Sequence, residues 1–325
     1  MMLHRRSALA ILASCLILPP ALQAQDASQF PQREARLVVP FPPGGPTDVI
    51  ARILAQGLEQ SWPKPVIVDN KPGAGTLIGT QLVAKAPPDG HTFGMVISAY
   101  TINPAIRSNM PYDTLRDLTG ITQVARANMV LVAAPGTPFN SVPELIAYAR
   151  ANPGKLSYAT PGPGTATHLA GELFKKEAGV DIVHVPYNGS GPALTDVMGG
   201  RVDIMFDIYH SVKPHVEANK LKLLALTAAE RDTAQPDVPV IAEQLPGFEV
   251  YSTIGLVAPA GTPPAIVQRI QADLAQVLAT PAVRDRFAQL GITPVGSSPD
   301  TWNAFIRSEI NRWTQVARDN NIRIE

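Results

Sequence analysis

Two Pro/Gly loops, each between a predicted strand and a predicted helix, carry the residues of this chain that are best placed for chemistry. The first reads FPPGGPTD over residues 41–48, and the second reads TPGPGTATH over residues 160–168. Such a loop brings free backbone N–H groups and the positive end of a helix dipole to one point, which favours a bound anion. The two segments align without a gap at an offset of 119 residues, so that Gly45 pairs with Gly164. We therefore expect two anion-binding half-sites that face each other, although one glycine loop alone is a weak signal because βαβ proteins commonly contain one.

The side chains in and around these loops can form hydrogen bonds but are not reactive. They are Thr47, Ser98, Thr101, Thr160, Thr165, Thr167 and Tyr187. Few cations accompany them, so an anion would be held by backbone N–H groups and hydroxyls, directly or through ordered water. Asp48, in the first turn of its predicted helix, either complements the helix dipole or orders the loop and meets a donor on the ligand. This set of groups is more typical of a receptor than of an enzyme.

Patterns for catalysis or cofactor binding are weak in this sequence. His168 and Glu172 have the i, i+4 spacing of metal ligands on a helix, but the HExxH motif is missing and His168 fits better as a hydrogen-bonding or capping residue. A third ligand would have to be His184, Asp203 or Asp207. Ser190 lies in NGSG, which differs from the GxSxG motif of serine hydrolases at one glycine. Neither loop contains the lysine of a P-loop or a GxGxxG motif with an acidic partner, so we expect no catalytic residue, metal or cofactor.

The first 24 residues have the pattern of an export signal. A basic start, HRR at residues 4–6, precedes an apolar stretch over 8–18 and the small residue Ala24, which suits cleavage. The apolar stretch is too short to span a bilayer, which needs about 20 residues. We therefore predict a cleaved signal and an exported protein. The arginine pair leaves Sec and twin-arginine export as alternatives, and the LASC sequence leaves lipoprotein anchoring at Cys15 as a minor one.

Charge and cysteine content narrow the class further. Cys15 is the only cysteine, so a chain cleaved near Ala24 has neither a disulfide nor a thiol nucleophile. The whole chain has 27 basic and 27 acidic residues, and loss of the arginine pair of the signal leaves a slight acidic excess. The sequence has no basic block, which makes nucleic acid and anionic membranes poor partners. About 300 mature residues can bury a sizeable core and commonly divide into two domains.

Short apolar runs alternate with amphipathic stretches along most of the chain, which predicts an α/β fold with parallel sheets. The predicted strands cover 37–39, 66–68, 93–98, 130–133, a stretch that begins at Leu156 before the second loop, 182–185, 202–206, 221–227, 251–258 and a short stretch that ends at Val295. Residues 98–104, SAYTINP, are expected to form the polar end of the third strand, and Asp207 stands at the carboxyl end of a later one. Ligands bind beyond the carboxyl ends of parallel strands, so the loops after Phe41, Asp69 and Ile97 should open on the binding side.

The predicted helices follow from apolar residues at i, i+3 and i+4 spacing. They begin after Thr47 and near Leu77 and Ser141, cover 169–178 and 193–198, and continue in a helix-rich tail over 265–278, 281–290 and 300–319. Ser141 and Glu144 have the spacing of a capping box, and Gly179 is a suitable helix stop. The aromatic residues of the last helix are expected to belong to the core.

Five segments of this chain, taken together, resemble one known family. They read VPFPPGGPTDVIAR, NKPGAGTLIGTQLVAKAPPDGHTF, GTATHLAGELFKKEAGVDIVHVPYNGSGPALTDVMGGRVDIMFD, PGFEVYSTIGLVAPAGTP and PVGSSPDTWNAFIRSEI. On these motifs the sequence resembles the tripartite tricarboxylate transporter substrate-binding family, also called Bug-type receptors. The segments occur in order and cover essentially the whole mature chain, which makes the resemblance far more specific than either glycine loop.

The resemblance implies a two-domain periplasmic binding protein fold, type II-like, in which crossing strands join two α/β domains and the ligand lies in the cleft between them. Domain 1 would comprise residues 25–124 and 250–325, and domain 2 would comprise residues 125–249. In this family the two glycine loops typically hold the carboxylate of a small acid, often through ordered water. Carried over by motif position, the ligand-binding residues are Phe41, Gly45, Thr47 and Asp48 of the first loop, Thr160, Gly164, Thr165, Thr167 and His168 of the second, Ser98 and Thr101 from domain 1, and Tyr187 and Asp207 from domain 2.

The resemblance also implies a function: a monomeric extracytoplasmic receptor that closes on a small carboxylate and delivers it to the permease subunits of a tripartite tricarboxylate transporter. Two departures from the family pattern, Tyr100 and Tyr209, predict a more aromatic distal end of the pocket. They favour an aromatic carboxylate or a dicarboxylate such as a medium-length aliphatic diacid. Two alternatives stay open, namely a sensor subunit that presents the ligand to a membrane kinase, and a hydrolase or lyase that uses the same cleft.

Overall fold

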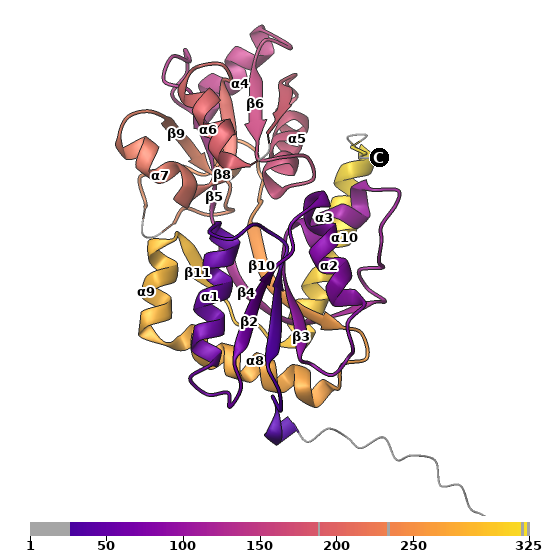
Figure 1. Cartoon of the computed structure of the whole chain (residues 1–325). Helices are drawn as coiled ribbons and strands as arrows, with labels where there is room; N and C mark the ends of the chain where they lie inside the picture. The colour runs from indigo at the N-terminus through magenta and orange to yellow at the C-terminus, as the bar shows by residue number, and fades with distance from the viewer. Residues whose placement is uncertain (1–26, 188, 233–234, 320–321, 324–325) are drawn as a thin grey trace, which may run out of the picture.

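The computed structural model describes residues 27–187, 189–232, 235–319 and 322–323. The predicted export signal and its Cys15 lie outside the described residues. Within them the chain forms two β-sheets with helices around both, which confirms the predicted α/β class. We call the part built on the six-stranded sheet the first lobe and the part built on the five-stranded sheet the second lobe (Figure 1).

The first lobe contains strands from both ends of the chain. Its sheet has the order β11-β4-β10-β3-β1-β2. The strands are β1 (Ala35–Val39), β2 (Val66–Asn70), β3 (Thr92–Ile97), β4 (Leu118–Ala127), β10 (Ser252–Pro259) and β11 (Ile292–Pro294). The helices are α1 (Pro46–Leu58), α2 (Leu77–Ala84), α3 (Ala99–Ile106), α8 (Pro264–Ala279), α9 (Pro281–Gln289) and α10 (Pro299–Asp319). Two short 3-10 helices cover Ala27–Gln29 and Ala74–Thr76.

The second lobe is formed by one continuous stretch of chain. Its sheet has the order β7-β6-β8-β5-β9. The strands are β5 (Met129–Ala133), β6 (Ser157–Thr160), β7 (Val183–Pro186), β8 (Ile204–Ile208) and β9 (Lys222–Leu226). The helices are α4 (Val142–Ala151), α5 (Ala166–Ala178), α6 (Ser190–Met198) and α7 (Tyr209–Glu217), and a 3-10 helix covers Ile241–Glu243.

The sheets are mixed rather than parallel, which corrects the sequence-based prediction. Strands β1, β2 and β3 run parallel, as do β6, β7 and β8, because a helix returns the chain between them. In contrast, β10 is antiparallel to β3 and β4, and β5 is antiparallel to β8 and β9. Strand β11 is also antiparallel to β4. The chain passes between the lobes twice: β4 leads through Asn128 into β5, and the segment after β9 leads into β10.

Two helices and one strand were not predicted from the sequence. Residues 98–104 are not a strand end, because the chain turns into α3 directly after Ser98. Pro104 lies inside α3, and the Thr101 hydroxyl donates a hydrogen bond to the Ser98 carbonyl at 3.0 Å. Strand β4 and helix α7 were also missed.

Local sequence explains the β1–loop–α1 unit well. Leu37 and Val39 of β1 are fully buried, and so are Ile50, Leu54 and Leu58, which recur on one face of α1. They belong to one apolar cluster between the first sheet, α1 and α8. Burial of these side chains fixes both ends of the glycine loop, so the loop itself needs no apolar contacts to be positioned.

One apolar cluster joins the two lobes on a single flank. Ile102 and Ile106 of α3 and Trp313 of α10 pack in the same cluster as Leu131 and Phe206 of the second sheet. Figure 1 shows α10 lying along α3 and extending toward the second lobe. Any change in the angle between the lobes must therefore pivot near this flank, because closely packed apolar contacts resist sliding.

The contact between α10 and the crossing strand β10 leads to a stability prediction. A Cβ atom on Gly255 would overlap the ring of Trp302, whose indole N–H donates to the Leu256 carbonyl at 3.2 Å. Gly255→Ala should therefore destabilise the protein by about 1–3 kcal/mol through overpacking and lower its melting temperature. Gly136→Ala is the matched control, because the added methyl group meets nothing within 4 Å. Equal melting temperatures of the two variants would contradict this account of the α10 contact.

Candidate functional site

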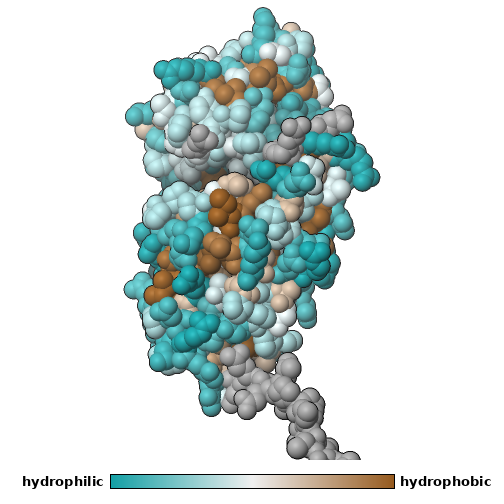
Figure 2. All heavy atoms as spheres, turned by 45° about the vertical axis from the view of Figure 1, so that its right-hand side comes forward, coloured by the Kyte–Doolittle hydropathy of each residue, from teal (hydrophilic) through white to brown (hydrophobic). Residues whose placement is uncertain are grey.

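A cavity of about 640 Å³ lies between the two lobes. Both glycine loops open into it, together with the start of α3, the crossing strands, the starts of α6 and α7, and the turn between α9 and β11. Figure 2 shows a largely hydrophilic surface in which apolar side chains gather on the first lobe, below the level at which the lobes meet. The cavity has the usual position of a ligand cleft between two α/β units.

Five helices begin at this cavity. Its lining includes Thr47 near the start of α1, Ser98 before α3, Ala166 in α5, Ser190 in α6 and His210 in α7. Within the described residues, α1 and α6 have no capping side chain, so their first backbone N–H groups are open to a ligand. Helix α7 has no capping side chain either, but its first N–H, that of Tyr209, donates to the Asn128 carbonyl at 2.9 Å. No lysine or arginine of the described residues lines the cavity. The site is therefore electropositive through helix ends and N–H groups instead of through cationic side chains.

Asp48 holds the first loop in shape. Its Oδ2 accepts hydrogen bonds from the Gly44 N–H at 2.8 Å and from Arg52 Nε at 2.9 Å. Its Oδ1 accepts from Asn70 Nδ2 at 2.9 Å and from Arg52 Nη2 at 3.0 Å. The Asn70 amide also donates to the Phe41 carbonyl, so both ends of the loop are tied to one carboxylate. The Arg52 guanidinium, with further hydrogen bonds from Gly44 and Asn70, lowers the pKa of Asp48 to about 2 even though the side chain is buried.

The second loop is held by an equivalent contact from a different residue type. The Gly164 N–H donates to Nδ1 of His168 at 3.3 Å, which is the same i to i+4 contact that joins Gly44 to Asp48. The N-caps of α1 and α5 are Gly45 and Thr165, and these lie 120 residues apart. The gapless sequence alignment at an offset of 119 therefore pairs the wrong residues at the two helix starts, which correspond at an offset of 120.

A stack of three rings, those of His168, His184 and Tyr158, packs behind this loop, and the first and last of them are buried. The ring of His168 stacks on His184 with centroids 4.3 Å apart, and His184 stacks on Tyr158 at 4.8 Å. Burial lowers the pKa of His168, and burial together with the neighbouring His168 lowers the pKa of His184 to about 4. Both rings are therefore neutral near pH 7, and Nδ1 of His168 can accept from the loop while Nε2 of His184 lies 2.8 Å from the Thr160 hydroxyl.

The His168 and Glu172 pair does not look like a metal site. The Glu172 carboxylate accepts hydrogen bonds from Tyr158 Oη at 2.5 Å and from Lys175 Nζ at 2.9 Å. No group of His, Cys, Asp and Glu side chains suited to a metal ion occurs among the residues that the structure describes. Glu172 instead anchors the ring stack.

Asp207 is the one acidic side chain of the described cavity lining. It is 1% exposed, and its Oδ1 accepts a hydrogen bond from the Ile208 N–H at 2.7 Å. Its Oδ2 has no hydrogen bond of normal geometry within the described residues, although the Ser190 hydroxyl favours the ionised form. Burial outweighs both contacts and raises the pKa of Asp207 to about 6. As predicted from the sequence, Asp207 lies at the carboxyl end of its strand, β8.

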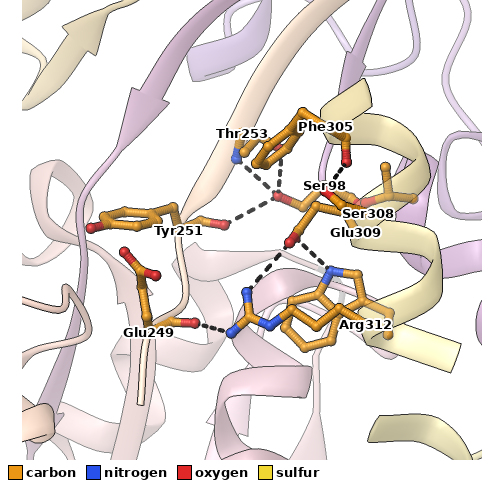
Figure 3. Close-up of polar contacts among 10 residues, drawn as sticks. Ser98, Glu249, Tyr251, Thr253, Phe305, Ser308, Glu309 and Arg312 are labelled. Carbon is orange, nitrogen blue, oxygen red and sulfur yellow. Dashed lines mark hydrogen bonds and ion pairs between the residues drawn. The ribbon is translucent and has the colours of Figure 1, made fainter. Parts of the chain in front are cut away.

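Ser98 connects the cavity to the crossing strand β10. Its Oγ accepts from the Thr253 N–H at 2.9 Å and donates to the Tyr251 carbonyl at 3.3 Å (Figure 3). The same view shows Arg312 of α10 between Glu309 of its own helix and the carbonyl of Glu249. Helix α10 is thus bonded to the segment by which the chain returns from the second lobe.

The apolar part of the cavity wall comes from aliphatic side chains. They are Ile50, Ile97, Ile208, Ile254, Leu290 and Ile292, beside Phe41. The predicted aromatic distal end is wrong. Tyr100 is buried in the first lobe, where its hydroxyl donates to the Thr114 carbonyl at 2.9 Å, and Tyr209 packs against the core of the second lobe. Their position in the sequence next to lining residues gave no sign that helices would turn them inward.

The structure brings only part of the predicted ligand-binding set to the cavity wall. The lining residues are Phe41, Gly45, Thr47, Ser98, Thr165, Thr167 and Asp207. The residues behind the wall are Asp48, Thr101, Thr160, Gly164 and His168, which hold loops or helix starts in place. Tyr187 lies apart from the cavity, in a shallow hollow among prolines, and its hydroxyl donates to Asp196 at 2.8 Å. Sequence reasoning missed Ser211, Ser252, Ile254, Leu290 and Ile292, which reach the wall only through the crossing strands and the ends of α7 and α9.

Comparison with known proteins gives one consistent family. A family model described as "Tripartite tricarboxylate transporter family receptor" matches residues 50–322. Protein BugT of Bordetella pertussis is 37% identical over 303 residues, which cover 92% of this chain and 93% of BugT. The predicted Bug-type resemblance is therefore confirmed.

Solved structures agree with this match and confirm the predicted periplasmic binding protein fold. The structure of Rpa4515 of R. palustris with adipate has a TM-score of 0.83 and 36% identity, covering 90% of this chain and 99% of that one. MatC of Rhodopseudomonas palustris with bound malate has a TM-score of 0.78 and 32% identity, covering 88% and 99%. Both solved relatives thus hold a small carboxylate.

Proposed function

Because this chain belongs to the tripartite tricarboxylate transporter receptor family, we propose that it is an exported receptor that binds a small carboxylate between its lobes and delivers it to the permease subunits of such a transporter. The observation that carries the proposal is the meeting of five helix starts at one cavity without a lysine or arginine in its described wall. Helix N-termini bind carboxylates through N–H groups and the helix dipole. Because the family consists of receptors, we propose that this chain is also a receptor and has no catalytic activity.

The cavity wall favours an acid with an apolar body. A carboxylate at the two glycine loops would leave the rest of the molecule against Ile97, Ile254 and Ile292. Rpa4515 holds adipate, whose methylene chain is apolar, and MatC holds the more polar malate. We therefore favour an aromatic carboxylate or an aliphatic dicarboxylate as the ligand, now on the basis of the aliphatic wall.

The site of action would be the periplasm. No helix in the described part of the chain combines the length and apolar character that crossing a bilayer demands. We propose that the first 24 residues direct export and that the mature protein divides into residues 25–124 with 250–325 and residues 125–249. The packing of Trp313 with the second sheet means that the end of α10 belongs to the contact between these two parts.

A thermal-shift screen of the mature protein against aromatic and aliphatic carboxylates tests this function. A ligand at 100 times its dissociation constant stabilises the folded state by about 2.7 kcal/mol. This should raise the melting temperature by several degrees. Benzoate-like acids and diacids such as adipate should give the largest shifts, and uncharged amides of the same acids should give none. Strong shifts with sugars or amino-acid amides, and none with any carboxylate, would refute the proposal once native mass spectrometry has shown that the pocket is empty.

A further inference from the structure

If Asp207 carries its ordinary negative charge, the cavity wall is poorly suited to bind an anion. A receptor for anions would then have one ionised acid, Asp207, in the wall of its ligand cavity. Two like charges beside each other in such a cavity repel, which weakens binding of the anion. The described wall supplies no cationic lysine or arginine to offset this repulsion.

The geometry of Asp207 offers a resolution. Its Oδ1 is used by the Ile208 N–H at 2.7 Å, whereas Oδ2 is buried at the cavity without a hydrogen bond of normal geometry among the described residues. A buried carboxyl oxygen without a donor is costly when it is charged, but it becomes a hydrogen-bond donor when it is protonated. A carboxylate ligand is an acceptor and would match that donor.

The charged groups on the neighbouring elements do not neutralise Asp207. Strand β5 has no titratable residue, and β6 has only Tyr158. The titratable groups of the helices packed around β8 are His168, Glu172, Lys175, Lys176 and Glu177 of α5, Asp196 of α6, and Tyr209, His210, Lys213, His215 and Glu217 of α7. Across the cavity, α1 adds Asp48, which is bonded to Arg52. In the described structure none of these groups hydrogen-bonds Asp207, and only His210 shares the cavity wall with it.

We propose that Asp207 is neutral when the cavity is occupied and donates its Oδ2–H to a carboxylate oxygen of the ligand, so that the receptor takes up one proton with each acid anion that it binds. This inference rests on the proposed function. The proton comes from solvent and stays on Asp207 until the ligand leaves. Burial already raises the pKa of Asp207 to about 6 in the free protein, and a bound anion beside it must raise that pKa further.

The consequence is a receptor whose affinity depends on pH. Above the pKa of free Asp207, each further pH unit should weaken binding about tenfold, until the pH reaches the pKa of the bound state. Release would then be favoured where the local pH is higher. Without Asp207 this dependence should disappear.

The main experiment is calorimetric titration of the mature protein with adipate and with benzoate between about pH 6.5 and 8.5, where both probes stay ionised. Runs in two buffers of different ionisation enthalpy should give an uptake of close to one proton per ligand near neutral pH. The affinity of Asp207→Asn for the acid should not change with pH, and its binding should take up no proton. The reason is that the asparagine amide donates a hydrogen bond but does not titrate in this pH range. Asp237→Asn removes an exposed carboxyl from the same lobe and should leave the proton uptake as in the unmodified protein.

A measurement without ligand completes the test. The folded state of the free protein should hold the Asp207 proton more tightly than the unfolded state, whose ordinary pKa is 3.8. The stability of the unmodified protein, measured relative to that of Asp207→Asn, should therefore fall as the pH rises from about 4 to about 6. Above pH 6 this difference in melting temperature should stay several degrees below its value at pH 4. A difference that does not change with pH would overturn the inference.

The outcomes separate this inference from the proposed function. Binding with proton uptake that disappears in Asp207→Asn supports both. Binding without proton uptake, or weaker binding by Asp207→Asn at every pH, means that an ionised Asp207 accepts a hydrogen bond from the ligand, and it overturns the inference alone. If no carboxylate in the wider panel binds at any pH, the proposed function fails and the inference fails with it.

Discussion

Thr47→Asp should abolish carboxylate binding without harm to the fold. Thr47 is partly exposed in the first turn of α1 and lines the cavity. An aspartate there would place a negative charge among the N–H groups that we assign to the ligand carboxylate. Repulsion between the two carboxylates costs several kcal/mol, so the affinity should fall by at least about 100-fold. Calorimetric titration with the best acid from the screen measures this loss.

The same substitution should preserve or raise the stability of the free protein. An acidic residue in the first turn of a helix typically stabilises it by about 0.3–1 kcal/mol. The existing Asp48 already has Arg52 as its partner, so the new charge would have only the helix end to interact with. The melting temperature of the free variant should therefore be equal to or above that of the unmodified protein.

Thr47→Asn is the matched control for the charge. Its side chain has nearly the shape of aspartate but no charge, so its loss of affinity should be far smaller. If Thr47→Asp and Thr47→Asn bind the acid equally well, the carboxylate does not bind at the first loop. The proposed position of the ligand would then be wrong, whatever the ligand is.

The parts of the site that sequence predicts well are those determined by local patterning. Both strand–loop–helix units were predicted because the continuous apolar run of β1 and the one-sided apolar face of α1 are visible within about 20 residues. The capping pair at Ser141 is partly confirmed, since its hydroxyl accepts from the Glu144 N–H, while the Glu144 side chain accepts from Asn140 instead of Ser141. Gly179 ends α5 in the left-handed region, as predicted.

The parts that sequence does not predict depend on contacts between distant segments. Tyr100 follows a lining residue, but α3 turns it into the core of the first lobe, where Thr114 accepts its hydroxyl hydrogen bond. Ile254 and Ile292 reach the cavity only because β10 and β11 join the first sheet from the far end of the chain. Whether the thirteen residues carried over by resemblance bind the ligand stays a prediction, and the geometry now separates those on the wall from those behind it.

Asp48→Ala should be the most damaging single change to the first loop. Asp48 accepts hydrogen bonds from the Gly44 N–H, from Asn70 and twice from Arg52. Its removal leaves the Gly44 N–H and one Asn70 donor without their acceptor, at a place that is only partly buried. The loss of hydrogen bonds to a charged group predicts a loss of about 1.5–3 kcal/mol in the free energy of unfolding. Urea unfolding at neutral pH measures it.

Ligand binding should suffer in the same variant, although Asp48 does not line the cavity. Its role is to hold the backbone N–H groups of the loop in one arrangement, so Asp48→Ala should lower the affinity by at least about tenfold through lost preorganisation. Arg52→Ala is the informative comparison, because it removes the exposed partner and leaves the contacts to Gly44 and Asn70. It should weaken binding less. If the two variants lose the same affinity, the ion pair of Asp48 with Arg52, and not the hydrogen bond from Gly44, determines binding.

The pH dependence of stability distinguishes this role of Asp48 from a simple packing role. The folded-state pKa of Asp48 is lowered from 3.8 to about 2, chiefly by Arg52, so its stabilising contribution is fully present above about pH 4 and is lost as the pH falls toward 2. Asp48→Ala should therefore unfold with a shallower loss of stability across this window than the unmodified protein, because it has no proton to take up there. A double-mutant cycle with Asn70→Ala should show coupling, since both side chains share one hydrogen bond and hold the same loop. Independent, additive effects and an unchanged acid profile would mean that the loop keeps its shape without Asp48, and the shape of the anion site would then have to come from the prolines and the helix start alone.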